Sequence, residues 1–191
     1  MMNVLIVCAH PNPLSFNQLI QKAINTAFKN KGATVRLKDL YAEKFDPVLG
    51  EAQLSLQNEG ELPDDIKHEQ EQVTWADTIV VIYPLWWFDR PAILKGWFDR
   101  VFTNGFAFAY DENGVKGLLT GKRSMVVVTA GGTEEDFGKN ADQLTKSTTE
   151  GTLVFCGITD IVDRVFYSVS TVDDGARKNM LDELEGMVKK F

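Results

Sequence analysis

The chain has 191 residues, of which 44% are hydrophobic and 25% charged, the balance of an ordinary globular domain. Its formal net charge of −7 argues against nucleic acid as a partner, because phosphate backbones would repel an acidic surface. The sequence shows no apolar run long enough to predict a membrane span and no pattern of a signal peptide, so we expect a cytoplasmic protein without membrane insertion.

The first 75 residues alternate between strand and helix patterns. Val4–Cys8 is a nearly continuous apolar run, which is typical of a strand buried on both faces. Residues 15–31 place apolar side chains at helical spacing. Residues 34–39 alternate like a half-exposed edge strand, the polar segment 49–64 has no clear pattern, and Pro63–Trp75 opens with a proline, as helices often do.

The same alternation continues to the end of the chain. Thr78–Tyr83 and Met125–Thr129 are again apolar runs rich in β-branched residues, and both predict buried strands. Pro91–Phe102 lies between them and predicts a helix that begins at its proline. A last strand is expected around Ile158–Tyr167, followed by an amphipathic helix from about Asp173 to Lys190.

This order of elements predicts an α/β fold. Parallel strands need crossover connections, so alternating strands and helices indicate a doubly wound parallel sheet with helices on both faces. At this length we expect one domain over residues 1–191, with five strands in the order 2-1-3-4-5. Ligands of such sheets bind beyond the carboxyl ends of the strands, where strands 1 and 3 diverge. The loops after Cys8, Tyr83 and Thr129 are therefore the expected site.

The loop at residues 9–18 leads directly into a helix. Free N–H groups and the positive dipole of a helix N-terminus favour a bound phosphate, and Ser15 and Asn17 could add side-chain donors. Ser15 and Gln18 also have the spacing of a capping box, which is a purely structural alternative. No Cys or Asp stands at a triad spacing from His10, so we expect this histidine to face a phosphate or to be hydrogen-bonded rather than to act as a base.

The histidines and cysteines predict neither a metal site nor a disulfide. His10 and His68 are isolated from each other, and two such residues do not form a metal site. Cys8 and Cys156 each lie in an apolar run, so we expect two buried, reduced thiols, as in a cytosolic protein.

The segment Tyr83–Phe102, Y-P-L-W-W-F-D-R-P-A-I-L-K-G-W-F-D-R-V-F, is the most specific part of the sequence. Trp86, Trp87 and Phe88 are consecutive, and neither helical nor strand spacing would bury all three. If exposed, they would form an apolar patch that monomers normally avoid. We therefore expect them to line a pocket for a flat ring or to form a dimer contact.

This segment closely resembles the NAD(P)H:quinone reductase (DT-diaphorase) family of flavodoxin-like enzymes. Other matching motifs are A-H-x-x-x-x-S-F-N at 9–17, D-L-Y-A-x-x-F-x-P at 39–47, T-A-G-G at 129–132, F-C-G at 155–157 and A-R at 176–177. The resemblance implies a flavodoxin-like fold and a flavin, FAD or FMN, bound in the crevice. It also implies NAD(P)H as electron donor for ping-pong, two-electron hydride transfer to a quinone, nitroaromatic or azo acceptor.

The resemblance assigns residues to each part of the flavin. It implies that the flavin phosphate is bound by His10, Ser15, Phe16, Asn17 and Gln18. The edge of the flavin ring is expected to contact Pro84, Leu85, Trp86, Trp87 and Phe88, whose backbone N–H groups would face it. The pyrimidine end of the ring is expected to contact Thr129, Ala130, Gly131 and Gly132, and the adenylate part of FAD is expected to contact Arg177.

The reacting end and the acceptor pocket are assigned in the same way. Gly131, Gly132 and Phe137 are the residues expected at the reacting end. The acceptor walls are expected from Trp86 and Phe88, with Phe106, Phe108 and Tyr110 of the second copy in a homodimer. Residues 97–110 also carry more aromatic side chains than one small core should absorb, which favours a symmetric dimer.

Three departures from the family pattern matter. Phe137 stands where the family has a tyrosine that shares the negative charge of the flavin, and the shortened stretch 138–150 lacks its partner histidine. The backbone N–H groups of Gly131 and Gly132 must then meet that charge. The segment 49–64 is shorter than in the animal enzymes, whereas Arg177 and the Ser-Phe-Asn match favour FAD over FMN.

Two other functions are compatible with a flavin site. The chain also resembles, less closely, bacterial flavoproteins that accompany potassium-efflux systems, and could be such a regulatory subunit. An acidic one-electron carrier of the flavodoxin type is the other alternative. The consecutive tryptophans argue against the carrier, because a carrier needs no second stacking cavity.

Overall fold

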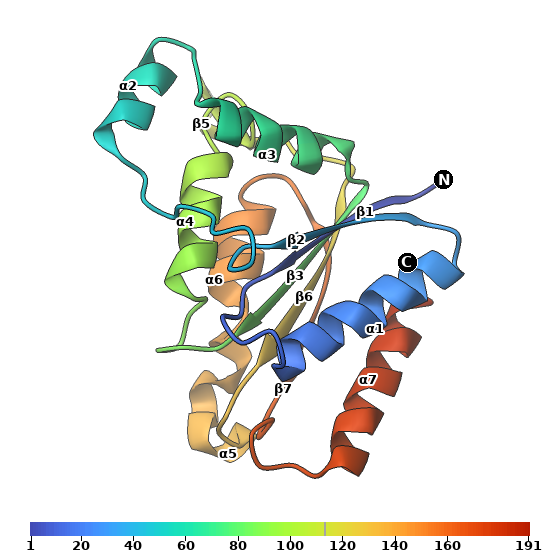
Figure 1. Cartoon of the computed structure of the whole chain (residues 1–191). Helices are drawn as coiled ribbons and strands as arrows, with labels where there is room; N and C mark the ends of the chain where they lie inside the picture. The colour runs from blue at the N-terminus through green and yellow to red at the C-terminus, as the bar shows by residue number, and fades with distance from the viewer. Residues whose placement is uncertain (113) are drawn as a thin grey trace.

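A five-stranded parallel sheet forms the centre of the fold (Figure 1). The computed structural model describes residues 1–112 and 114–191. The strands of the sheet are β1 (Asn3–Cys8), β2 (Thr34–Asp39), β3 (Thr78–Pro84), β6 (Arg123–Thr129) and β7 (Asp160–Phe166). Their spatial order is β2-β1-β3-β6-β7, and neighbouring strands are parallel throughout. The predicted order 2-1-3-4-5 is thus confirmed when the strands of this sheet are counted alone.

Helices cover both faces of the sheet. The four long helices are α1 (Phe16–Asn30), α3 (Asp64–Trp75), α4 (Ala92–Val101) and α7 (Asp174–Val188). Val4 and Ile6 of β1 belong to the core beneath α1 and α7, which lie side by side (Figure 1). Leu5 and Val7 belong to the opposite core, beneath α3 and α4. Because successive residues of a strand alternate between two buried faces, the central strands read as continuous apolar runs.

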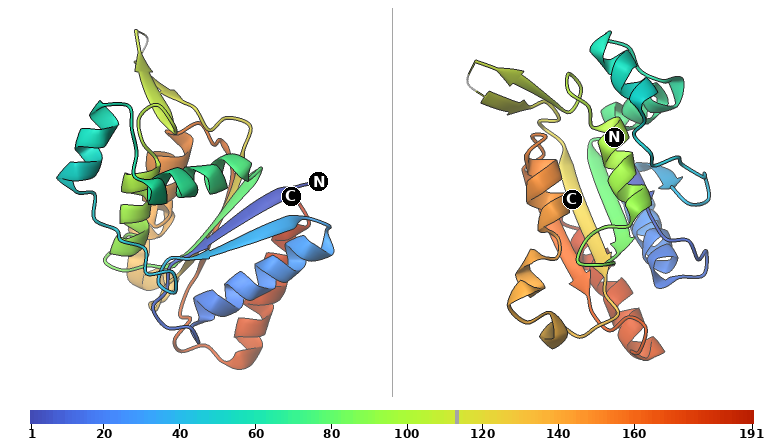
Figure 2. Two further views of the ribbon diagram at one scale, coloured as in Figure 1. Left: turned by 45° about the horizontal axis from the view of Figure 1, so that its top comes forward. Right: turned by 90° about the vertical axis from the view of Figure 1, so that its left-hand side faces the viewer.

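Several short elements lie outside the predicted ones. They are α2 (Glu51–Asn58), the antiparallel strands β4 (Phe108–Asp111) and β5 (Gly114–Gly117), and the series α5 (Glu134–Phe137), η1 (Gly138–Gln143), α6 (Lys146–Thr148) and the π-helix η2 (Thr149–Val154). Strands β4 and β5 project beyond the central sheet (Figure 2). Each of these elements has eight residues or fewer, which is too short to show a clear periodicity.

Part of the expected aromatic surface is instead core. Trp97 is completely buried and Phe102 is 7% exposed, so the expectation that residues 97–110 lie outside the core was wrong for these two. Trp97 lies on the buried face of α4, where helical spacing brings it into register with the other core residues. Phe106 and Phe108 are half-buried, and Tyr110 is exposed.

Both cysteines are free and buried, as the sequence predicts. Burial raises the pKa of the Cys8 thiol to about 12 and that of the Cys156 thiol to about 11, so neither forms a thiolate at neutral pH. Among the residues that the structure describes, no helix has the length and apolar character needed to cross a membrane.

Candidate functional site

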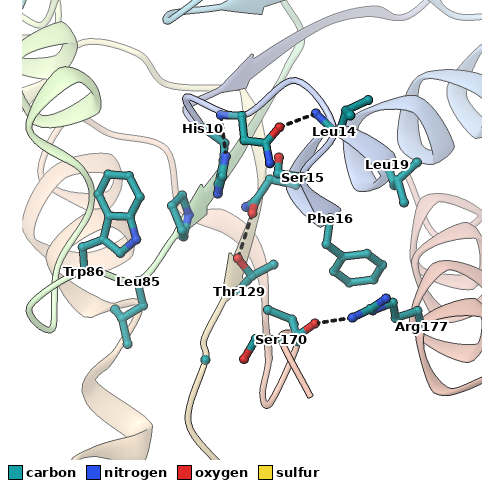
Figure 3. Close-up of a pocket in the computed structure, with 15 residues that line it drawn as sticks. His10, Leu14, Ser15, Phe16, Leu19, Leu85, Trp86, Thr129, Ser170 and Arg177 are labelled. Atoms are coloured by element: carbon teal, nitrogen blue, oxygen red, sulfur yellow. Dashed lines mark hydrogen bonds between the residues drawn. The ribbon is translucent and has the colours of Figure 1, made fainter. Parts of the chain in front are cut away.

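A cavity of about 610 Å³ lies beyond the carboxyl ends of β1, β3 and β6 (Figure 3). This volume is in the range of small-molecule sites. The sequence-predicted residues that line it are His10, Ser15, Phe16, Asn17, Pro84, Leu85, Trp86, Thr129, Gly131 and Arg177. The cavity is long, because Figure 3 shows Trp86 at one side and Arg177 at the other, with Phe16 and Thr129 between them.

The N-terminus of α1 presents backbone donors to this cavity. The hydroxyl Oγ of Ser15 caps the helix by accepting from the N–H of Gln18 at 3.3 Å. In the described part of the chain, the N–H groups of Phe16 and Asn17 have no hydrogen-bond partner. Free N–H groups at a helix N-terminus attract anions, and the dipole of α1 adds to this effect.

The Asn17 side chain carries a buried donor without a partner. Asn17 is 2% exposed, and its Oδ1 accepts from the Thr129 hydroxyl at 2.9 Å, which ties α1 to the end of β6. This contact fixes the amide so that Nδ2 is left as the donor, and Nδ2 is buried with no partner in the described residues. A buried unpaired donor costs about 1–3 kcal/mol, so its position in a cavity indicates a ligand acceptor.

His10 adds another donor. Its Nδ1 accepts from the backbone N–H of Asn12 at 3.1 Å, which assigns the ring proton of the neutral form to Nε2. The pKa of His10 is lowered, chiefly because burial disfavours the charged ring. At neutral pH His10 is therefore an uncharged hydrogen-bond donor beside the free end of α1, and among the described residues it forms no hydrogen bond or ion pair with a carboxylate that would make it a base.

Arg177 supplies positive charge at the far end of the cavity. Its Nη2 donates to the Val169 carbonyl at 3.2 Å, and Nη1 lies 3.4 Å from the exposed Asp174 carboxylate. Its Nε is buried and has no partner among the described residues. The two orphaned buried donors of the cavity, on Asn17 and Arg177, thus come from different helices and suit an elongated anionic ligand.

The loop after β3 forms the opposite end of the cavity. The N–H of Leu85 donates to Thr129 at 2.8 Å, and the N–H of Trp86 donates to Asp89 at 2.9 Å. Those two donors are therefore not available to a ligand. The N–H groups of Trp87 and Phe88 have no partner in the described chain, so only these two of the five loop residues offer backbone donors.

The turn after β6 offers two further backbone donors. The backbone N–H of Ala130 donates a hydrogen bond of 2.8 Å to the carbonyl of Phe166 at the end of β7. The Gly132 carbonyl accepts from the backbone N–H of Ser168 at 2.9 Å. The N–H groups of Gly131 and Gly132 have no partner in the described residues. Gly131 lines the cavity, whereas a Cβ on Gly132 would point at Asp136, 3.0 Å from its Oδ2, rather than into the cavity.

Phe137 belongs to an aromatic row beside this turn. Its ring lies 5.7 Å from Phe88 in an edge-to-face contact and 5.9 Å from Tyr167. Phe88 is 57% exposed and Trp87 is 96% exposed. These rings form an exposed apolar border at the end of the cavity that Trp86 lines. Trp86 is 41% exposed, and its ring centroid lies 6.1 Å from that of His10.

Some expected residues do not line the cavity. Gln18 turns away from it, because its Nε2 donates to Asp39 Oδ2 at 2.5 Å. This contact also means that the capping box is only half formed, since the Gln18 side chain does not return to Ser15. The other expected residues outside the cavity lining are Trp87, Phe88, Ala130, Gly132, Phe137, Phe106, Phe108 and Tyr110.

Five residues that the sequence analysis did not name also line the cavity. They are Asn12 and Leu14 of the predicted loop at 9–18, Leu19 of α1, and Val169 and Ser170. Val169 and Ser170 belong to the loop after β7, which lies next to the turn after β6 because β6 and β7 are neighbours. The carboxyl-end rule applied to the last strand as well as to the first, third and fourth would have identified this loop.

Comparisons with known proteins identify the family to which this fold belongs. The model of a family described as having a flavodoxin-like fold matches residues 2–189. A Haemophilus influenzae protein called an uncharacterized NAD(P)H oxidoreductase is 36% identical over 185 residues, which cover 95% of this chain and 91% of that protein. Human ribosyldihydronicotinamide dehydrogenase [quinone] is 34% identical, with 93% of this chain and 87% of that protein covered.

A solved structure is similar over nearly the whole chain. The NAD(P)H:quinone oxidoreductase from Methanothermobacter marburgensis superposes with a TM-score of 0.85 at 32% sequence identity. The superposition covers 98% of this chain and 95% of that one.

Proposed function

Because the chain belongs to the flavodoxin-like family that includes NAD(P)H:quinone reductases, we propose that it is a flavin-dependent NAD(P)H dehydrogenase (quinone). We take residues 1–191 as one flavin-binding domain that works in the cytoplasm. The observation that carries the proposal is the elongated cavity with unpaired donors along its length. When bound there, a flavin supplies the hydride chemistry between NAD(P)H and a quinone, nitroaromatic or azo acceptor.

The residues of the cavity divide into a phosphate end and a ring end. Phe16 and Asn17 hold the phosphate with backbone and amide donors, and His10 contributes its Nε2–H. At the ring end, the N–H groups of Gly131 and Gly132 stabilise negative charge on the reduced ring without any reorganisation, because their turn is already fixed by bonds to β7 and the residues after it.

We propose FAD rather than FMN, because the cavity continues past the α1 N-terminus to Arg177. Replacing this residue in Arg177→Met should weaken FAD binding about tenfold or more, since a hydrogen bond to a charged group contributes about 1.5–3 kcal/mol. FMN binding should change about threefold at most. Titration of apoprotein with each flavin, followed by flavin fluorescence, measures both dissociation constants.

The matched control is Lys178→Met, whose side chain is 76% exposed on the same helix and pairs with Asp182. It should leave both dissociation constants unchanged. An equal loss of FAD and FMN affinity in Arg177→Met would instead place this arginine at a phosphate that both cofactors share.

The acceptor is proposed to bind between two copies of the chain. Trp86 and Phe88 would form one wall of its pocket, and the other wall would come from Phe106, Phe108 and Tyr110 of the second copy. Tyr110 is 68% exposed and Trp87 is 96% exposed, and a two-fold partner would cover such exposed aromatic side chains. Sedimentation equilibrium at micromolar concentration should give twice the chain mass. A stable monomer at that concentration would contradict this arrangement.

Steady-state kinetics separate the enzyme from its alternatives. The flavin-loaded protein should oxidise NAD(P)H with a quinone, and double-reciprocal plots at several acceptor concentrations should be parallel, as ping-pong kinetics require. Binding of flavin without turnover would favour the regulatory subunit of a potassium-efflux system. Slow, one-electron exchange with no quinone dependence would favour a flavodoxin-type carrier.

A further inference from the structure

The loop that carries Trp87 and Phe88 adopts a conformation that its sequence disfavours. Trp86 and Asp89 exchange two backbone hydrogen bonds, and the two residues between them have φ angles of 51° and 61°. A two-residue turn with positive φ at both central positions is normally made by Asn-Gly, because bulky side chains are strained there. Such strain persists only where surrounding structure enforces it.

Asp89, which closes the turn, and Arg90, which follows it, hold the turn in this conformation. Asp89 Oδ1 accepts from the Ser147 hydroxyl at 2.6 Å and from the backbone N–H of Arg90 at 2.7 Å. The Arg90 side chain is 5% exposed, and its Nη1 donates to Thr152 Oγ1 at 2.9 Å and to Thr148 Oγ1 at 3.3 Å. We call the set Asp89, Arg90, Ser147, Thr148 and Thr152 the loop clamp.

The far side of the loop clamp is itself well anchored. Thr148 is completely buried and shares a hydrogen bond of 2.9 Å with the Tyr83 hydroxyl at the end of β3. Thr152 lies in the π-helix and donates to the Ser147 carbonyl at 2.9 Å. The guanidinium of Arg90 also lies over the Phe98 ring, 4.9 Å from its centre. The turn is therefore attached to the sheet and to α4 through Arg90.

We propose that Asp89 and Arg90 are positioning residues, which hold Trp87 and Phe88 in the left-handed turn so that their two unpaired N–H groups are preorganised for the flavin ring. The inference rests on the proposed function. It assigns a role to the buried guanidinium of Arg90, two residues after Phe88: its charge orders threonine acceptors from another segment. The side chains of Asp89 and Arg90 contact neither NAD(P)H nor the electron acceptor, and they act through the backbone of the turn.

Hydrogen exchange in the apoprotein tests whether Arg90 holds the turn in place, and it requires no flavin. In Arg90→Met, the amide protons of Trp86 and Asp89, which close the turn, should exchange at least about tenfold faster, because local opening becomes easier. Amides of β3 such as Val80 should be unchanged. Thr152→Val removes one acceptor without changing size, and should give a smaller acceleration at the same two amides even if Arg90→Met folds poorly.

A rescue variant separates positioning from general stability. Glycine adopts positive φ without strain, so Phe88→Gly in the Arg90→Met background should restore slow exchange at Trp86 and Asp89. The control Lys95→Met alters a half-exposed cation on α4 and should leave exchange at wild-type rates. Failure of the glycine rescue, or unchanged exchange in both clamp variants, would overturn the proposal.

Whether the held turn assists reduction of the flavin is tested with bound FAD. In Thr152→Val the reduction of the flavin by NAD(P)H should slow about tenfold, because a small misplacement of oriented groups is costly. The dissociation constant for FAD should change by about threefold at most, since the phosphate donors on α1 are untouched. Wild-type protein that binds neither FAD nor FMN would refute the proposed function, whereas wild-type kinetics in the clamp variants would refute the loop clamp alone.

Discussion

The Gly132→Val variant should be reduced by NAD(P)H at least about a hundredfold more slowly than the wild type, which is the cost of losing one preorganised donor to a developing negative charge. The valine Cβ would lie 3.0 Å from Asp136 Oδ2 and 3.4 Å from the Phe137 ring. Asp136 Oδ2 accepts from the backbone N–H of Thr133 at 2.7 Å, so the crowding breaks this capping box. The turn then shifts, and its unpaired Gly131 and Gly132 N–H groups leave their positions.

Stopped-flow measurement of the flavin absorbance follows this reduction directly. The control is Gly186→Val, since a Cβ at Gly186 on α7 meets no atom within 4 Å and lies away from the turn. Flavin content should be measured for both variants, so that a loss of rate is not confused with a loss of cofactor. Gly132→Val protein that retains its flavin and is reduced at the wild-type rate would show that this turn does not meet the charge.

The Glu69→Ala variant should lose about 3 kcal/mol in free energy of unfolding, the cost of breaking a buried ion pair by removing one partner. Glu69 is 5% exposed, and its carboxylate contacts Lys38 Nζ at 2.8 Å and the Trp97 indole N–H at 2.8 Å. Burial disfavours the Lys38 ammonium, but its bonds to Glu43 and Glu69 outweigh this effect and raise the pKa of Lys38. Without Glu69, both Lys38 and Trp97 lose a buried partner.

Urea denaturation of the apoprotein measures this loss, because bound flavin would otherwise add its own stabilisation. Glu69→Gln should retain an acceptor for Trp97 and lose less stability than Glu69→Ala. The control Glu71→Ala removes an exposed carboxylate 3.8 Å from His68 on the same helix and should change stability by about 0.5 kcal/mol or less. Equal effects of Glu69→Ala and Glu71→Ala would show that the buried contacts of Glu69 do not stabilise α3 against β2 and α4.

The three central strands and the long helices could be predicted because each buries a continuous or periodic apolar pattern. The hairpin of β4 and β5 was missed, although Asn113-Gly114 in the sequence is a common hairpin signal. Trp97 was misplaced because its neighbours in sequence were considered instead of its helical spacing. Leu94, Trp97, Phe98 and Val101 form a regular apolar stripe on α4, and all four are buried.

The position of the cavity and the polar character of its lining could also be predicted from the sequence. Its position follows from the strand order, and the polar residues that begin α1 follow from the chemistry of helix N-termini. The direction of each donor does not follow from the sequence. Gln18 is as polar as Asn17, yet its side chain is taken by Asp39, whereas Asn17 keeps a free Nδ2 because Thr129 occupies its other atom.

The loop of Trp87 and Phe88 shows a deeper limit. Local sequence preference predicts no left-handed turn at two bulky aromatic residues. The turn forms because Asp89 and Arg90 bind Ser147 and Thr152, about 60 positions later in the chain. Such a conformation depends on tertiary contacts, and only the folded chain reveals it.

The flavin content of the purified protein tests the central claim most directly. We predict a yellow protein with one non-covalent flavin per chain, released by heat or acid. Chromatography of the released flavin against FAD and FMN standards should identify FAD, in keeping with a cavity that extends to Arg177. A colourless protein that binds neither FAD nor FMN when they are added would contradict the account.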